Sequence, residues 1–311
     1  MKILVTGGAG FIASNLVDKL IELGHEVSIV DNLFSGKREN INQRAKFYEE
    51  DITNSPGLEK VFQQEKPEIV FHLAALPLVA STKEPSEDAR VNIVGSINLI
   101  ILCKDYKVKK IIYSNSGGAS YGEPLFLPMN EEHPLKPVCP YAISKHTVEH
   151  YLEIYKKDYG LNFTSLRYAN VYGSRQDPFG EGGVIAIFTN KLLKRERPTI
   201  FGDGTQIRDY VYVEDVVNAN IWAIDNGGGE AYNVGCGVGT TTQEIFDVLN
   251  KEISSNLQPI YECERIGDVK ECILDSTKLR KIGWFSKYNL REGIKKTIEY
   301  YKREYAKETR F

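Results

Sequence analysis

The chain has no long apolar run. None of its 311 residues belongs to a hydrophobic stretch near the ~18 residues that a membrane-spanning helix requires. The apolar segment at residues 3–5 is also too short for the hydrophobic core of a secretory signal. We therefore expect a cytoplasmic protein.

Cysteine is scarce and follows no pairing pattern. The five cysteines are an odd number and include no C-x-x-C pair, which predicts reduced thiols rather than a disulfide framework. His146 and His150 share a helical face, but a third ligand at motif spacing is missing. The sequence therefore predicts no metal site.

Charge is nearly balanced. Lysine and arginine number 39 against 42 aspartates and glutamates, a net charge of −3, so no global basic surface favours nucleic acid or an anionic membrane. An anionic ligand must meet local positive groups instead. A hydrophobic content of 42% is ample for a large core.

The first half of the chain alternates short β-branched runs with amphipathic helical patterns. The runs lie at residues 3–5, 27–30, 46–48, 69–71 and 111–113. This rhythm predicts an α/β fold, a Rossmann-type doubly wound parallel sheet that binds ligands at the carboxyl ends of its strands.

Past about residue 170 the rhythm breaks, which predicts a smaller, mixed α/β lobe. We expect residues 1–170 to form the Rossmann domain, with 208–230 returning to it, and residues 171–207 and 231–311 to form the second lobe. From Leu290 on, a Lys/Glu-rich pattern predicts a solvated surface helix.

A glycine-rich segment follows the first strand and opens a helix. In this setting the backbone amides of Gly7, Gly10, Phe11 and Ile12 can hold a pyrophosphate. Asp31 ends the next strand, where a carboxylate can accept hydrogen bonds from an adenosine ribose and repel a 2′-phosphate. We predict NAD as cofactor. The alternatives are NADP, served by the nearby Lys37 and Arg38, or a plain glycine turn with a strand-ending cap.

Tyr141 and Lys145 stand four residues apart, with Ser116 upstream. On a helix this spacing brings an ammonium close to a phenol, and a neighbouring positive charge lowers the pKa of a tyrosine. Such a phenolate can take a proton from an alcohol. The spacing alone is weak, because Tyr106 and Lys110 share it. The order of glycine turn, serine and Tyr-x-x-x-Lys is what predicts a redox site.

With these residues in place, the chain resembles the extended short-chain dehydrogenases/reductases, and among them the nucleotide-sugar epimerases of the UDP-glucose/UDP-galactose 4-epimerase type. The resemblance runs essentially end to end. Its specific stretches are residues 5–12, 30–33, 71–75, 141–145, 166–173 and 208–213.

The resemblance implies roles for individual residues. Ser116 would bond the sugar hydroxyl, Tyr141 would be the base, and Lys145 would bind the nicotinamide ribose and lower the pKa of the tyrosine. Further cofactor contacts would come from Asn32, Asp51, Ile52, Leu73, Ala74, Ala75, Asn92, Ser114 and Tyr168.

The second lobe resembles the family's UDP pocket. The diphosphate and ribose would be bound by Asn170, Arg208, Arg265 and Asp268. Thr199 and Phe201 would lie on the uracil side. Cys272 occupies the family's gatekeeper position beside the sugar's 2-substituent, and its small size predicts that N-acetylated UDP-sugars are accepted. The plainer alternatives are surface salt bridges for the arginines and a core-filling thiol.

The resemblance thus implies an NAD-dependent UDP-hexose 4-epimerase that works through a transient 4-keto sugar, acting as a homodimer through helices at 86–105 and 141–158. Related dehydratases and decarboxylases usually carry acidic residues after the catalytic serine or threonine, where this chain has Gly117 and Gly118. A UDP-uronate epimerase or decarboxylase, and a catalytically silent NAD-binding regulator, remain as alternatives.

Overall fold

The computed structural model describes residues 1–179, 183–264 and 269–308, and the chain forms two compact units. The first unit comprises Met1–Ser120, Pro137–Arg167 and Val217–Tyr232. The second comprises Tyr121–Lys136, Tyr168–Val216 and the chain from Asn233 on. The segment that returns to the first unit is therefore 217–232, where the sequence suggested 208–230.

A seven-stranded sheet in the order β10-β6-β5-β4-β1-β2-β3 is the centre of the first unit. Its strands are β1 (Lys2–Thr6), β2 (Glu26–Asp31), β3 (Lys46–Glu49), β4 (Ile69–His72), β5 (Lys110–Ser116), β6 (Phe163–Tyr168) and β10 (Glu230–Val234). The five strands from β3 to β5 in this order pair in parallel. The predicted Rossmann-type sheet is confirmed.

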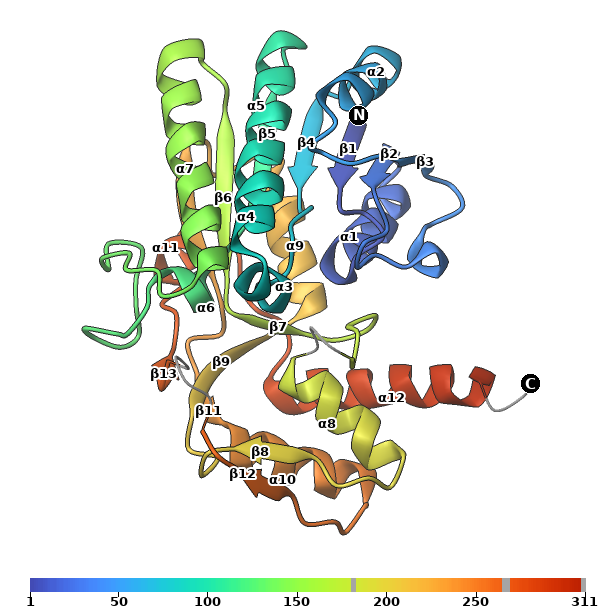
Figure 1. The fold of residues 1–311 in the computed structure, drawn as a ribbon, viewed down its shortest axis with the longest axis vertical. Helices are drawn as coiled ribbons and strands as arrows, with labels where there is room; N and C mark the ends of the chain where they lie inside the picture. The colour runs from blue at the N-terminus through green and yellow to red at the C-terminus, as the bar shows by residue number, and fades with distance from the viewer. Residues whose placement is uncertain (180–182, 265–268, 309–311) are drawn as a thin grey trace. The chain divides into compact units, whose positions relative to one another are not determined.

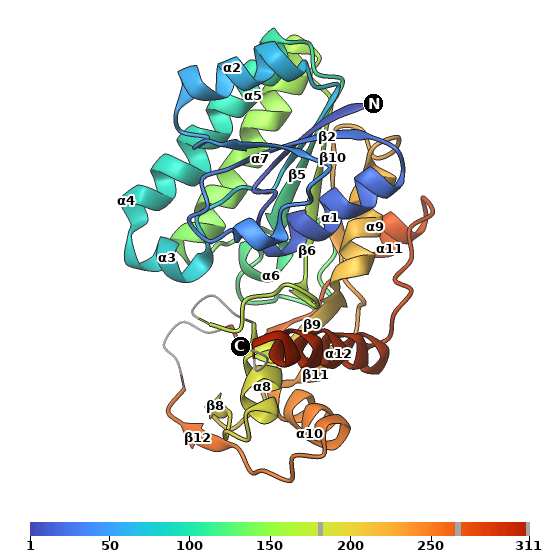
Figure 2. The same cartoon turned by 90° about the vertical axis from the view of Figure 1, so that its right-hand side faces the viewer.

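Helices cover both faces of this sheet (Figures 1 and 2). α2 (Ser55–Glu65), α5 (Ser96–Asp105) and α7 (Pro140–Tyr159) lie on one face, and α1 (Phe11–Glu22) and α9 (Val213–Ala223) on the other. Apolar side chains from α2, α5 and α7 meet those of the strands in one fully buried cluster. Burying this apolar surface is the main favourable term for the unit.

Between β4 and α5 the chain does not form the single helix expected over residues 86–105. α3 (Leu78–Lys83) and α4 (Pro85–Asp88) lead into a π-helical segment, Ala89–Gly95, that continues into α5. Gly95 is needed there because a Cβ would approach Cγ1 of Ile52 to 2.7 Å. Such π-helical turns are rare and often occur at functional sites.

The second unit is built around β9 (Ile207–Tyr212). Its partners are β11 (Gly239–Thr241), β13 (Glu271–Cys272) and β7 (Asn170–Tyr172), while β8 (Thr199–Phe201) and β12 (Ile260–Glu262) form a separate pair. Its main helices are α8 (Val184–Leu193), α10 (Thr242–Ile253) and α12 (Leu290–Glu308). Thr241 and Glu244 begin α10 with a reciprocal capping box. The predicted C-terminal helix exists, but it buries one face through Ile294, Ile298 and Tyr301.

Among the described residues, no helix combines the length and apolarity needed to cross a bilayer.

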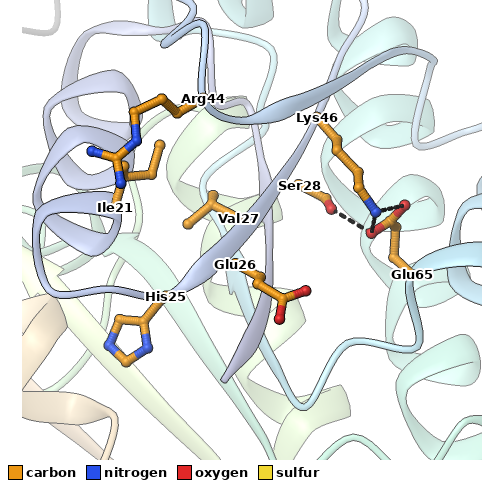
Figure 3. Close-up of a pocket in the computed structure, with 8 residues that line it drawn as sticks. All are labelled: Ile21, His25, Glu26, Val27, Ser28, Arg44, Lys46 and Glu65. Carbon is orange, nitrogen blue, oxygen red and sulfur yellow. Dashed lines mark hydrogen bonds and ion pairs between the residues drawn. The ribbon is translucent and has the colours of Figure 1, made fainter.

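A cavity of about 180 Å³ lies at the start of β2, at the opposite end of that strand from Asp31 (Figure 3). Glu65 from α2 is buried there and accepts hydrogen bonds from Ser28 (2.9 Å), Lys46 (2.9 Å) and Tyr48. Burial alone would raise the pKa of Glu65, but these donors hold it below its usual range. Because the carboxylate is saturated, we assign the cluster to stability.

Replacing Glu65 by Gln should lower the free energy of unfolding by about 2 kcal/mol, because it removes charge-assisted hydrogen bonds in a buried position. A depressed folded pKa contributes stability above the unfolded pKa and loses it as pH falls. The difference from the parent protein should therefore be full above about pH 5 and shrink toward about pH 3.

The measurement is urea unfolding across this pH range. Glu22→Gln, which breaks an exposed pair with Lys19, is the matched control and should cost under about 0.5 kcal/mol. Equal effects of the two substitutions would contradict the assignment.

Candidate active site

The glycine turn after β1 is held by close backbone contacts. Gly7 donates its N–H to the carbonyl of Val30 at 2.8 Å and has a φ of +73°. A Cβ on Gly7 would lie 2.7 Å from the backbone nitrogen of Ala74. Both the left-handed conformation and the close approach of the β4 loop require glycine here.

Asp31 fixes this turn from the end of β2. Its carboxylate accepts the N–H of Ala9 at 2.9 Å and that of Leu33 at 2.8 Å. The side chain is buried, and burial raises its pKa. A carboxylate offers about four acceptor positions, so two remain for the hydroxyls of a ribose.

The amino end of α1 fits an anionic ligand. Its cap residue is Gly10, and within the described chain no side chain caps this end or places a carboxylate in the first turn. The first amides of the helix are thus available, and their dipole favours negative charge. The glycine turn, free amides and Asp31 together fit the pyrophosphate and adenosine ribose of a dinucleotide.

The other residues expected at the cofactor differ in how strongly the protein already uses them. Asn32 donates to Asp51 at 2.9 Å, and Asp51 also accepts from Thr53, so hydrogen bonds hold the pKa of Asp51 low against burial. Ile52 is buried in the core. Leu73, Ala74 and Ala75 follow β4 beside Gly7, Ser114 lies within β5, and Tyr168 belongs to the second unit.

Ser116, Tyr141 and Lys145 all belong to the first unit. Ser116 is the last residue of β5, Tyr141 lies in the first turn of α7, and Lys145 follows one turn later. The ammonium of Lys145 is 4.4 Å from the ring centroid of Tyr113, whose hydroxyl donates to the carbonyl of Lys145 at 3.2 Å. Tyr113 therefore fixes both ends of this lysine.

The charge of Lys145 is set by opposing effects. Burial lowers the pKa of Lys145 to about 7, while Asp88 and Glu149 act to raise it. Glu149 is itself buried on α7 and forms an ion pair with Arg167 at 2.7 Å. Although its burial opposes ionisation, the nearby His146 and hydrogen bonds from Arg167 and Ser165 bring the pKa of Glu149 to about 2.

Sequence reasoning missed Tyr113, Asp88, Glu149 and Arg167. The spacing of Asp88 and Asn92, four residues apart, could have suggested a shared helical face. Nothing local could have placed Tyr113 or Arg167, which come from β5 and β6.

In the second unit, three expected substrate residues lie around β9. Arg208 is the register partner of Cys272 in β13, and Asn170 in β7 pairs with Tyr210 two residues further along β9. Thr199 and Phe201 lie in β8, in the separate two-stranded sheet. Arg265 and Asp268 lie outside the described residues.

Asp209 holds this region together. Its buried carboxylate accepts N–H groups from Cys236 at 3.0 Å, Gly237 at 3.1 Å and Leu274 at 3.4 Å. Burial outweighs these bonds and raises its pKa to about 6. Asp209 therefore ties β9, which carries Arg208, to the chain just after Cys272.

The described residues contain no cluster of three or more side chains suited to a metal ion. His146 and His150 do meet on α7, with their Nε2 atoms 3.2 Å apart.

Comparison with known proteins agrees with this geometry. The profile of the NAD dependent epimerase/dehydratase family matches residues 3–235. The UDP-glucose 4-epimerase of Mycolicibacterium smegmatis is 41% identical over 310 residues, covering 97% of this chain and 99% of that protein. The crystal structure of UDP-glucose 4-epimerase from Thermotoga maritima with UDP-glucose is 49% identical, with a TM-score of 0.97 over 98% of this chain and 100% of that one.

A third similar structure is the UDP-N-acetylglucosamine 4-epimerase of Methanobrevibacter ruminantium, in complex with UDP-N-acetylmuramic acid. It is 36% identical, with a TM-score of 0.92 over 97% of this chain and 98% of that one. The fold and the glycine turn define an NAD-dependent enzyme of Rossmann type. The chain belongs to the NAD-dependent epimerase/dehydratase family, and NAD is its cofactor.

Replacing Gly7 by Ala should weaken NAD binding at least about tenfold, because the new Cβ strains a left-handed residue and clashes with the backbone at Ala74. Calorimetric titration of NAD-free protein measures the loss. Gly24→Ala is the matched control, since Gly24 has a φ of +83° but open space around it. NAD affinity in Gly7→Ala equal to that in Gly24→Ala would refute this reading of the turn.

Proposed function

We propose that this enzyme is a UDP-hexose 4-epimerase, an isomerase that interconverts UDP-glucose and UDP-galactose. The observation that carries the proposal is the placement of Tyr141 and Lys145 one turn apart on α7, with the lysine buried against Tyr113. The UDP-glucose 4-epimerases to which the chain is similar support the same reaction. Galactose metabolism is the corresponding pathway.

Tyr141 acts as the base that removes the proton from the 4-hydroxyl of the hexose and later returns it. An ammonium at Lys145, one turn further along α7, would favour the phenolate form of Tyr141. Ser116, at the end of β5, donates a hydrogen bond to the same sugar oxygen. When bound at the glycine turn and Asp31, NAD would supply reversible hydride transfer at carbon 4, so that the 4-keto sugar could be reduced on its opposite face. NAD is therefore not consumed.

The nucleotide end would be held by the second unit. Arg208 and Asn170 lie around β9 and supply a guanidinium and an amide for the diphosphate and ribose. Thr199 and Phe201 in β8 would flank the uracil. Arg265 and Asp268 complete the proposed set.

The chain after Ser116 favours epimerisation over elimination or decarboxylation. α6 (Gly117–Ser120) begins with two glycines and contains no acidic residue. α6 therefore supplies no carboxyl group directly after Ser116 for a second proton transfer. We therefore favour the epimerase over a UDP-uronate epimerase or decarboxylase. A catalytically silent regulator is disfavoured because Tyr141 and Lys145 are both present.

We further propose a homodimer that works in the cytoplasm. α7 exposes half of the side chains of Ile143 and Ile154, and the neighbouring π-helical segment exposes half of Val94. An apolar face shared by adjacent helices suits a two-fold contact with a second copy. The five cysteines are free in the structure, which suits a reducing compartment.

Tyr141→Phe should reduce the interconversion of UDP-glucose and UDP-galactose by about 10²- to 10⁴-fold, because the variant lacks the base. Chromatography of the UDP-sugars after incubation measures it, and a pentose nucleotide would instead reveal a decarboxylase. The matched control is Tyr106→Phe, which removes a phenol at the same spacing from a lysine and should leave the rate unchanged. Undiminished turnover by Tyr141→Phe would overturn the proposed mechanism.

The N-acetylated substrates UDP-N-acetylglucosamine and UDP-N-acetylgalactosamine are proposed in addition. Cys272 is buried in β13 opposite Arg208, and burial raises the pKa of its thiol to about 11, so it is a small neutral side chain. A small residue beside the 2-substituent leaves room for an acetamido group. The similar UDP-N-acetylglucosamine 4-epimerase supports this assignment.

Cys272→Tyr should abolish turnover of the N-acetylated pair first, with a loss at least about tenfold larger than for the plain hexoses, because added bulk excludes the larger group. Rates with all four UDP-sugars give the comparison. Cys272→Ala, which keeps the space, should preserve both pairs. If Cys272→Tyr lowered the turnover of the N-acetylated sugars and of the plain hexoses equally, the proposed gatekeeper role would be wrong.

A further inference from the structure

Asp88, the last residue of α4, has a buried carboxylate with two side-chain donors. Its Oδ1 accepts from Ser144 Oγ on α7 at 3.1 Å and from Asn92 Nδ2 at 2.7 Å. Ser144 lies between Tyr141 and Lys145, and its hydroxyl also contacts the carbonyl of Tyr141 at 2.9 Å. One oxygen of Asp88 therefore reaches the turn of α7 that carries both proposed catalytic side chains.

Asn92 extends this contact toward the loop after β4. Its Oδ1 accepts the N–H of Leu76 at 2.6 Å, and its Nδ2 donates to the carbonyl of Leu76 at 3.1 Å. The second amide hydrogen serves Asp88, so both hydrogens of Asn92 are used inside the protein. The π-helical segment places Asn92 at this position, one turn after Asp88.

The network continues to the glycine turn. Ser96 Oγ donates to the carbonyl of Asn92 at 2.6 Å and lies 2.8 Å from Nε2 of His72. His72 Nδ1 is 2.8 Å from Thr6 Oγ1, which also accepts the N–H of Ala74. Burial lowers the pKa of His72 to about 3, so the neutral ring joins these groups without adding charge.

Asp88 is hydrogen-bonded to Ser144, the residue before Lys145, and its charge acts to raise the pKa of Lys145. The titratable groups around Lys145 are Asp88 from α4, Tyr141 and Glu149 from α7 and, from the sheet, the neutral His72 and Tyr113. Asp88 is the larger of the two charges that oppose the effect of burial on the lysine. Glu149 is already paired with Arg167, whereas the partners of Asp88 are neutral. In a buried setting such an unneutralised carboxylate acts over several ångströms.

We propose that Asp88 is a positioning residue of the active site, which ties the first turn of α7 to the loop after β4 and supplies the negative charge that keeps Lys145 an ammonium. The inference rests on the proposed function of Tyr141 and Lys145. Asp88 does not touch the substrate. It acts through Ser144, Asn92 and Lys145.

Two substitutions separate the hydrogen bond between Asp88 and Ser144 from the negative charge of Asp88. Asp88→Asn keeps an oxygen acceptor for Ser144 and Asn92 but removes the negative charge. Ser144→Ala removes the hydrogen bond from α7 to Asp88 but keeps that charge. Glu87→Gln is the matched control, because Glu87 is the neighbouring residue of α4, half-exposed and paired with Arg90. All are measured in the full-length protein saturated with NAD.

For Asp88→Asn we expect kcat to fall about tenfold at neutral pH, with KM within about twofold. The ratio of parent to variant kcat should rise from about pH 6 to about pH 8, because a lysine without its negative neighbour deprotonates earlier. Ser144→Ala should lower kcat by a factor that does not vary with pH. Glu87→Gln should match the parent throughout.

A readout independent of turnover is the ultraviolet titration of the Tyr141 phenolate, taken as the difference from Tyr141→Phe. Asp88→Asn should shift this titration to higher pH, since less ammonium faces the phenol. The titration remains informative if the protein epimerises no UDP-sugar, so failure of the proposed function is distinguishable from failure of this inference. An unshifted phenolate titration, or a kcat ratio for Asp88→Asn that is constant with pH, would overturn the charge role.

Discussion

The buried ammonium of Lys145 is the charge around which the polar interior of the first unit is arranged. An isolated cation in a protein core is costly, and its pKa falls until it becomes neutral. Here the ring of Tyr113 lies 4.4 Å away, and the carboxylates of Asp88 and Glu149 offset part of the cost. Both carboxylates raise the pKa of Lys145, and the larger contribution comes from Asp88 at the end of α4.

The same polar groups connect the glycine turn to the helix that carries the proposed catalytic residues. The hydrogen bonds that run from Asp88 through Asn92, Ser96 and His72 end at Thr6, next to Gly7. A buried hydrogen-bonded network of this kind favours one arrangement of the elements that it joins. The loop that approaches Gly7 and the helix that carries Tyr141 are thus held by one set of polar groups rather than by apolar packing alone.

The second unit uses a carboxylate in a comparable way, although with backbone partners. Asp209 gathers N–H groups from two later segments onto β9, next to Arg208. The effect of burial on the pKa of Asp209 outweighs that of these hydrogen bonds, so this pKa rises to about 6. We infer that Asp209 contributes more to the position of β9 than to stability, since it fixes the strand that carries Arg208, the residue proposed to bind the diphosphate.

The sequence by itself determined the parallel sheet, the glycine turn with Asp31, and the family, because strand rhythm and left-handed glycines are local properties of the chain. It could not decide between two Tyr-x-x-x-Lys spacings by distance along the chain. Tyr106 directly follows α5, and Lys110 begins β5, where its ammonium donates to the carbonyls of Ala223 and Asn226. Tyr141 and Lys145, in contrast, share one helix.

Only the tertiary structure brought Tyr113, Asp88 and Arg167 to α7 and replaced part of the expected helix at 86–105 by a π-helical segment. Burial and charge pairing between distant residues are set by packing, and no local pattern records them.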